Sequence, residues 1–131
     1  DILKDVRIEK RPLRLQCERE IKTKLISLRQ GYISSLGRKE GLAAVLVRSI
    51  TGSMALFRAI ITLLGKEPPV SRAAVVKTFG EATALETEIY EKLLMLKAGT
   101  VKPSEQDLHD LFERYYNALE SVGKIIDDLP V

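Results

Sequence analysis

Apolar residues recur at every third or fourth position along most of the chain, and this spacing restricts the fold more than any other feature. In an α-helix such residues share one face, whereas a half-buried strand requires strict alternation. The two clearest stripes are Leu13, Cys17, Ile21, Leu25, Leu28 and Tyr32, and then Leu108, Leu111, Tyr115, Leu119, Val122, Ile126 and Leu129. No strand-like alternation follows Ile8. The pattern therefore predicts an all-α protein, an up-and-down bundle of four to five helices with a short N-terminal extended segment.

Capping and helix-breaking residues divide the chain into five predicted helices. Proline suits a first turn, as at Pro12; serine caps an N-terminus, as at Ser71 and Ser104; and glycine often follows a C-terminus, as at Gly99. These signals predict helices over residues 12–36, 39–64, 72–79, 86–98 and 105–129. Gly80 is predicted to end the third helix, and Gly52 is predicted to bend or break the second. The i,i+4 spacing predicts ion pairs along the helices, namely Glu18 with Lys22, Glu20 with Lys24 and Glu88 with Lys92.

The length and composition predict one folded domain. A chain of 131 residues that is 45% hydrophobic and 30% charged lies within the globular range. We expect the bundle to span residues 13–131. Residues 1–12 begin with Asp1 rather than Met and place Ile2, Val6 and Ile8 on one face of a strand. We expect them to be a linker or extended segment that leads out of an upstream domain; a frayed terminus is the alternative.

A cytoplasmic location is predicted from the cysteine and hydropathy patterns. Cys17 is the only cysteine, so the chain cannot form an internal disulfide. The stretch between Gly41 and Gly65 is apolar and long, but it contains Arg48, Arg58 and a cluster of small polar residues. These features predict a central helix of a soluble bundle and no membrane partner.

The charge is distributed unevenly. Residues 1–65 carry 13 Lys or Arg against 6 Asp or Glu, a net +7, and residues 66–131 carry 8 against 12, a net −4. Such asymmetry indicates that the basic half faces an acidic partner, a phosphate or nucleic acid. The alternative is that the two halves attract each other within the bundle.

Several common catalytic and cofactor sites are excluded by the residues present. Neither GxGxxG nor GxxxxGK[ST] occurs, and His109 is the only histidine, so a zinc site with paired histidines cannot form. His109 is expected to face solvent. Cys17 has no histidine nearby in sequence, and Asp127 and Asp128 point about 100° apart on a helix. We therefore predict no catalytic residue, no metal site and no cofactor in this chain.

The candidate ligand-binding residues centre on two arginines. Arg48 and Arg58 lie in the least polar predicted helix, and burial of an unpaired guanidinium is costly. Each should pair with a carboxylate of a later helix or with a phosphate or carboxylate of a ligand. The whole candidate set is Arg29, Arg48, Ser49, Thr51, Ser53, Arg58 and Tyr116. In this set the hydroxyl groups would donate hydrogen bonds, and Tyr116 would stack on a ring.

Several segments resemble, in the same order, the C-terminal helical region of bacterial nucleotidyltransferase-like proteins. They are residues 13–20 (LRLQCERE), 28–32 (LRQGY), 57–59 (FRA), 65–69 (GKEPP) with Ser71-Arg72, and 112–120 (FERYYNALE). The resemblance implies a bundle similar to nucleotidyltransferase substrate-binding domains and to the C-terminal domain of kanamycin nucleotidyltransferase. It also implies a relation to the HEPN domains.

This resemblance implies an accessory role for the chain. In such proteins a separate α/β domain carries the Gly-Ser and Asp-x-Asp motifs, so Mg²⁺ and nucleotide would bind in an upstream nucleotidyltransferase-like domain. Gly52-Ser53 is not followed by an Asp-x-Asp motif. HEPN ribonucleases use an arginine placed a few residues before a histidine, but no arginine stands four to seven residues before His109. We therefore expect a non-catalytic substrate-binding or docking domain. The alternatives are a free-standing interaction module, such as a homodimer, and an RNA-binding HEPN-like domain.

Overall fold

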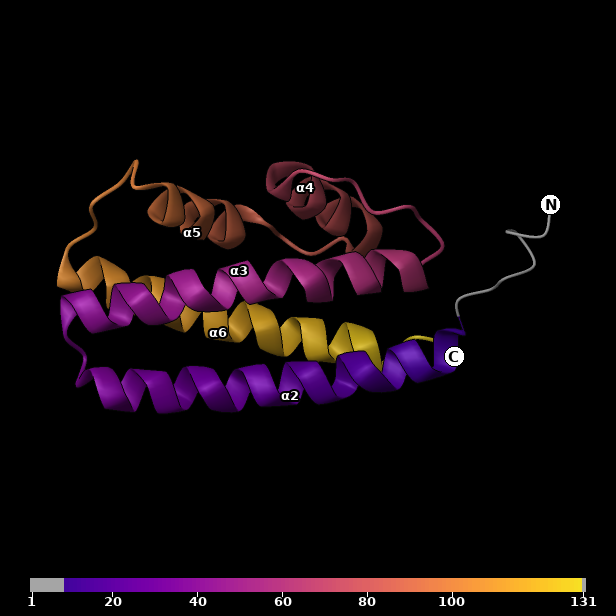
Figure 1. Ribbon diagram of the computed structural model, residues 1–131, viewed down its shortest axis with the longest axis horizontal. Helices are drawn as coiled ribbons and strands as arrows, with labels where there is room; N and C mark the ends of the chain where they lie inside the picture. Colours follow the sequence, from indigo (N-terminus) through magenta and orange to yellow (C-terminus); the bar gives the residue numbers. More distant parts are fainter. Residues whose placement is uncertain (1–8, 131) are drawn as a thin grey trace.

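The computed structural model describes residues 9–130, and within this range it contains five α-helices and no strand (Figure 1). The helices are α2 (Lys10–Ser35), α3 (Lys39–Leu63), α4 (Arg72–Thr83), α5 (Glu88–Ala98) and α6 (Glu105–Asp127). The all-α bundle predicted from the apolar spacing is therefore confirmed. Of the predicted linker or extended segment, residues 1–12, the first eight lie outside the described residues. Helix α2 already includes Pro12, so residues 10–12 are helical rather than part of a linker.

Helix α3 occupies the centre of the bundle and contacts all four other helices. In Figure 1, α2 lies along one side of α3, α4 and α5 lie along the other, and α6 passes behind. The chain runs along α2, returns along α3, crosses back through α4 and α5, and ends along α6. The arrangement is thus an up-and-down four-helix bundle whose third position is shared by two short helices.

The two long stripes read from the sequence form the interfaces of α2 and α6. Cys17, Ile21 and Leu28 of α2 are buried, as are the α6 residues Leu108, Tyr115, Leu119, Val122 and Ile126. Helix α6 begins with a capping box, because Ser104 accepts from the Asp107 N–H and Asp107 accepts from the Ser104 N–H. At its other end Arg14 donates to the carbonyl groups of Ile126 and Asp127, both at 3.2 Å. These contacts fix both ends of α6 and hold its C-terminus beside the start of α2.

The end of α4 differs from the sequence prediction. Gly80 does not terminate the helix, which continues to Thr83 and ends where Ala84 adopts a left-handed conformation with φ 61°. A Cβ atom at Gly80 would lie 2.6 Å from Thr87 Cγ2. The glycine therefore permits close packing of α4 against the segment that leads into α5.

Helix α3 continues without interruption through Gly52, so the predicted break there is wrong. By length and composition alone, α3 is the one helix within residues 9–130 that could cross a membrane, and half of its most apolar window is buried in the bundle. Burial against four other helices is the environment of a core helix in a soluble protein.

Candidate anion-binding groove between α2 and α3

A groove of about 570 Å³ runs between α2 and α3. Leu28 and Val45 form part of its floor and are themselves buried in the hydrophobic core. Thr23 and Ser27 of α2 and Ala55 of α3 also line it, and these small side chains leave the space between the two helices open. The volume falls within the range of roughly 300–1,000 Å³ that is typical of small-molecule sites.

Three cationic side chains line this groove, against one carboxylate. Arg19 and Lys24 come from α2 and Arg48 from α3, while the carboxylate belongs to Glu20. Arg19 and Arg48 are exposed, and neither makes a hydrogen bond or an ion pair with any residue between 9 and 130. Their guanidinium groups are thus available to an incoming anion.

Lys24 lies deeper than the two arginines. Its ammonium group donates a hydrogen bond to the Ser49 carbonyl oxygen at 3.3 Å. Burial lowers the pKa of Lys24 below its usual value of 10.5, and the negative charge of Glu20 raises it in part. The predicted Lys24–Glu20 ion pair does not form within 4.0 Å; the Glu20 carboxylate instead accepts from the Gln16 amide at 3.1 Å. An ammonium group has three donors, so two remain for a ligand.

Gly52 provides the space that Lys24 occupies. A Cβ atom at this position would lie 3.2 Å from Lys24 Nζ. Gly52 lies one helical turn after Arg48, and Ala55 follows three residues later, so the three share one face of α3. A larger residue in place of the glycine would displace the ammonium group from the base of the groove.

The groove lies wholly within the basic half of the chain, since α2 and α3 end before residue 65. The described residues form three ion pairs, which are Arg14–Glu18, Lys92–Glu88 and Arg114–Glu88. None of them joins the basic half to the acidic half. The Glu88–Lys92 pair was predicted, whereas Glu18 pairs with Arg14 rather than with Lys22. Contact ion pairs therefore do not neutralise the basic half of the bundle within residues 9–130.

The sequence-predicted site residues do not form one site. Ser49 and Ser53 were expected to donate to a ligand, but both hydroxyl groups lie within hydrogen-bond distance of the Tyr115 hydroxyl, at 2.8 and 2.7 Å. Ser53 is fully buried. Thr51 donates to the Val47 carbonyl one turn earlier in α3. The serines therefore satisfy a core tyrosine, and only the half-buried Ser49 also lines the groove.

Neither Arg48 nor Arg58 pairs with a carboxylate of a later helix among residues 9–130, so this predicted partner is wrong. The alternative partner, an anion of a ligand, stays a prediction. Arg48 is exposed and lines the groove. Arg58 is half-buried and donates to the Val70 carbonyl at 3.0 Å, which fixes the connection between α3 and α4. Arg58 is absent from the residues that line the groove.

Arg29 and Tyr116 come together at a different place, where α2 meets α6. The Arg29 guanidinium donates to the Tyr116 hydroxyl at 2.6 Å, and its central carbon lies 5.6 Å from the centre of the Tyr116 ring. The Phe112 ring stacks on the Tyr116 ring, with 6.2 Å between their centroids, and is tilted against the Tyr32 ring at 4.6 Å. The surface around this contact is a second, smaller candidate binding site.

His109 and Cys17 both have structural environments. His109 Nε2 donates to the Gly37 carbonyl at 3.0 Å, and the Tyr32 hydroxyl lies 2.7 Å from its Nδ1. The expectation that His109 faces solvent is thus wrong, because its ring is half-buried and holds the α2–α3 turn. Cys17 is buried, and burial raises the pKa of its thiol to about 11.

Arg19 and Lys24 were not among the sequence-predicted site residues. The i,i+4 rule assigned Lys24 to a surface ion pair with Glu20, and this assignment concealed it. The sequence feature that could have indicated the groove is on α3. There one cation, Arg48, shares a helix face with the small residues Gly52 and Ala55. Within residues 9–130, no group of three or more His, Cys, Asp and Glu side chains is arranged to hold a metal ion.

No protein-family model, curated protein or solved structure matches the chain.

Proposed function

We propose that the chain is a non-catalytic accessory domain of a nucleotidyltransferase-like protein, and that its α2–α3 groove serves as a substrate-binding or docking site. The observation that carries this proposal is the groove itself, in which three cations face one carboxylate above an apolar floor. An open groove with unpaired cations is suited to binding a partner or ligand rather than to stabilising the bundle.

The family-like segments support the nucleotidyltransferase part of the proposal. Residues 28–32 and 112–120 belong to two of these segments, and the Arg29–Tyr116 contact joins them directly. Residues 13–20 include Arg19, which lines the groove. Three of the five segments that carry the resemblance thus lie at the Arg29–Tyr116 contact or at the candidate groove.

In this proposal the chemistry belongs to a partner domain. A nucleotidyltransferase-like domain upstream in the same protein would carry the Gly-Ser and Asp-x-Asp motifs and would bind Mg²⁺ and the nucleotide. The present chain would hold or orient the acceptor in the cytoplasm. Transfer should therefore require the partner domain, and the accessory chain should change mainly the apparent affinity for the acceptor.

Two measurements test the proposal. The first is the sequence of the gene that encodes the chain and of its neighbours. We expect the same reading frame or an adjacent one to encode a domain with both motifs. The second is transfer of a nucleotide by that domain with and without the present chain, for which we expect a lower KM for the acceptor when the chain is present. A gene context without such a domain, or identical kinetics in both assays, would contradict the proposal.

RNA binding is the second candidate, and the cations of α2 and α3 favour it. Those cations would contact the phosphate backbone, so binding should weaken steeply as salt is raised. A filter-binding titration of a single-stranded RNA from 50 to 300 mM salt measures this dependence. Weak RNA binding at all salt concentrations would leave the accessory role as the better explanation of the basic half.

Self-association is the third candidate. Exposed apolar residues on α2, among them Leu15, Ile26 and Ile33, would form the contact surface. Sedimentation velocity of the chain distinguishes this case, because a stable dimer at micromolar concentration would favour a free-standing interaction module over an accessory domain.

A further inference from the structure

We propose that the α2–α3 groove binds a small phosphomonoester whose body presents an apolar face. The inference rests on the proposed binding role of this groove, to which it adds the class of ligand. It does not depend on the identity of the partner domain, so the two proposals can fail separately.

The charges that line the groove match the charge of a phosphomonoester. Arg19, Lys24 and Arg48 contribute three positive charges and Glu20 one negative charge, a net +2. A phosphomonoester carries about −1.5 to −2 charges at pH 7 and presents three acceptor oxygens. Guanidinium groups bind two of these oxygens at once, while an ammonium group acts as a compact point charge. Two arginines and one lysine therefore provide a set of donors suited to a tetrahedral dianion.

The position of Lys24 distinguishes this groove from an ordinary basic surface. Its ammonium group is half-buried, donates one hydrogen bond to the Ser49 carbonyl and has no carboxylate within 4.0 Å among residues 9–130. Partial desolvation of an ammonium group costs free energy, which an anionic partner would offset. An anion that enters the groove would supply that partner.

The size and floor of the groove indicate a ligand larger than phosphate alone. Its volume is about 570 Å³, whereas a free phosphate ion needs well under 100 Å³, on the order of a few water volumes. Leu28, Val45 and Ala55 line the groove beside the charged residues and offer an apolar surface. A ring or short hydrocarbon attached to the phosphate would cover this surface and gain free energy from its burial.

Phenyl phosphate is a suitable probe, and isothermal titration calorimetry of the 131-residue chain at low salt is a direct measurement. We expect phenyl phosphate to bind at least tenfold more tightly than inorganic phosphate, because only the former reaches the apolar floor. Phenol should not bind detectably. Equal affinity for phenyl phosphate and inorganic phosphate would overturn the apolar part of the inference, and an absence of binding by both would overturn it entirely.

Matched variants assign the binding to the groove. Lys24→Met and Arg48→Gln should each weaken phenyl phosphate binding about tenfold, as expected for loss of one charge-assisted contact. Lys22→Met removes the same charge two residues from Lys24, at an exposed position that does not line the groove. It should change the affinity less than twofold. Similar losses in the Lys22 and Lys24 variants would show that only the overall charge matters, and would overturn the inference.

Gly52→Ala gives a test that does not remove a charge. The added methyl group would lie 3.2 Å from Lys24 Nζ and shift it by a few tenths of an ångström, while alanine favours the helix over glycine. We expect weaker phenyl phosphate binding together with a thermal midpoint that is unchanged or higher. Unaltered affinity in this variant would contradict the placement of Lys24 at the base of the site.

The outcomes separate the two proposals. Loss of phenyl phosphate binding with an intact effect on nucleotide transfer would refute the phosphomonoester inference and leave the accessory role standing. Specific binding in the groove without any nucleotidyltransferase partner would refute the accessory role and support the ligand class.

Discussion

The hydroxyl groups of Ser53 and Tyr115 lie 2.7 Å apart in the interior of the bundle and join α3 to α6. Ser53 Oγ donates its hydrogen to the Ser49 carbonyl at 3.0 Å, so Tyr115 is the donor between the two hydroxyl groups. Ser49 Oγ lies 2.8 Å from the same phenol oxygen and can donate to it. Burial raises the pKa of Tyr115 to about 12, with the two serine hydrogen bonds lowering it in part. The buried phenol is thereby fully satisfied.

Tyr115→Phe should destabilise the bundle by about 1–2 kcal/mol, because it removes the donor to Ser53 and the acceptor for Ser49 while keeping the ring. Urea unfolding followed by circular dichroism measures the change. The slope of the free energy against urea should stay the same, since the buried area changes little. An unchanged midpoint would mean that the hydrogen bonds contribute no net stability.

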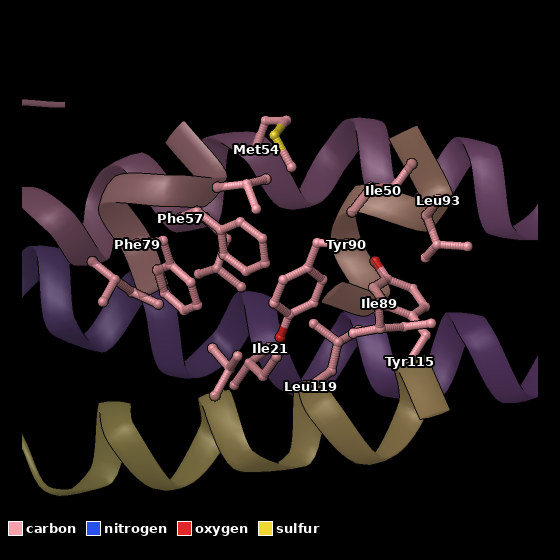
Figure 2. Close-up of a cluster of buried hydrophobic side chains, with 14 of the residues drawn as sticks. Ile21, Ile50, Met54, Phe57, Phe79, Ile89, Tyr90, Leu93, Tyr115 and Leu119 are labelled. Carbon is pink, nitrogen blue, oxygen red and sulfur yellow. The ribbon is translucent and has the colours of Figure 1, made fainter. Parts of the chain in front are cut away.

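Tyr90→Phe should leave the free energy of unfolding unchanged or raise it. The Tyr90 hydroxyl is buried and has no hydrogen-bond partner among the described residues, and Figure 2 shows it directed toward Ile21. An unsatisfied buried hydroxyl costs roughly 1–3 kcal/mol, so its removal should leave stability equal or higher. The same urea experiment makes each tyrosine the control for the other. A loss as large as that of Tyr115→Phe would show that Tyr90 is hydrogen-bonded, for example to a buried water.

Cys17 should react slowly with a thiol reagent in the folded protein. Burial raises its pKa to about 11, and the nearby charge of Glu20 adds to the effect. At pH 8 about one thiol in a thousand would then be ionised, and the thiolate is the reactive form. The release of thionitrobenzoate from Ellman's reagent measures the rate. We expect slow modification in buffer and fast modification in 6 M guanidinium chloride, whereas similar rates would mean that Cys17 is accessible in the folded state.

Lys24→Met should leave the free energy of unfolding at pH 7 unchanged or raise it. The lysine is charged in both the folded and unfolded states at this pH, and its partial burial costs free energy that methionine does not pay. The pKa of Lys24 is lowered in the folded state, so the unfolded state binds more protons between that pKa and 10.5. Lys24 therefore makes stability rise with pH in this window. The difference in unfolding free energy between the variant and the parent should shrink as the pH approaches 10.5, and a difference independent of pH would contradict this.

The helices could be predicted from the sequence because burial follows a simple period. The two long stripes, the Ser71 and Ser104 caps and the Gly99 C-cap are all present in the structure as predicted. Each depends on residues close together in sequence, where helix geometry alone decides which side chains share a face. The division between Tyr115 in the core and Tyr116 at the edge followed from the same argument and is confirmed.

The groove could not be predicted, because it depends on which helix faces are left uncovered. Arg48 was expected to be buried in an apolar helix, yet its side chain is exposed at the groove between α2 and α3. Ser53 was expected to serve a ligand, yet a tyrosine more than sixty positions later takes its hydroxyl group. Gly80 was predicted to end a helix, but a glycine can also be required where two elements pack closely. The sequence alone does not distinguish these two roles. In each case the deciding neighbour is distant in sequence.

Val122→Asp should unfold the bundle, and it tests the apolar stripe on which the fold prediction was based. Val122 is fully buried in the α6 interface, and a carboxylate there would have to be desolvated or protonated. The cost of several kcal/mol is a large fraction of the roughly 5–15 kcal/mol that stabilise a domain of this size. Circular dichroism should show loss of the helical signal or a thermal midpoint lowered by more than about 10 °C, since roughly 1 kcal/mol shifts the midpoint by several degrees. Asn117→Asp introduces the same charge at an exposed position of α6 and should have little effect. If both variants melted like the parent chain, Val122 could not lie in the interface between α6 and the other helices.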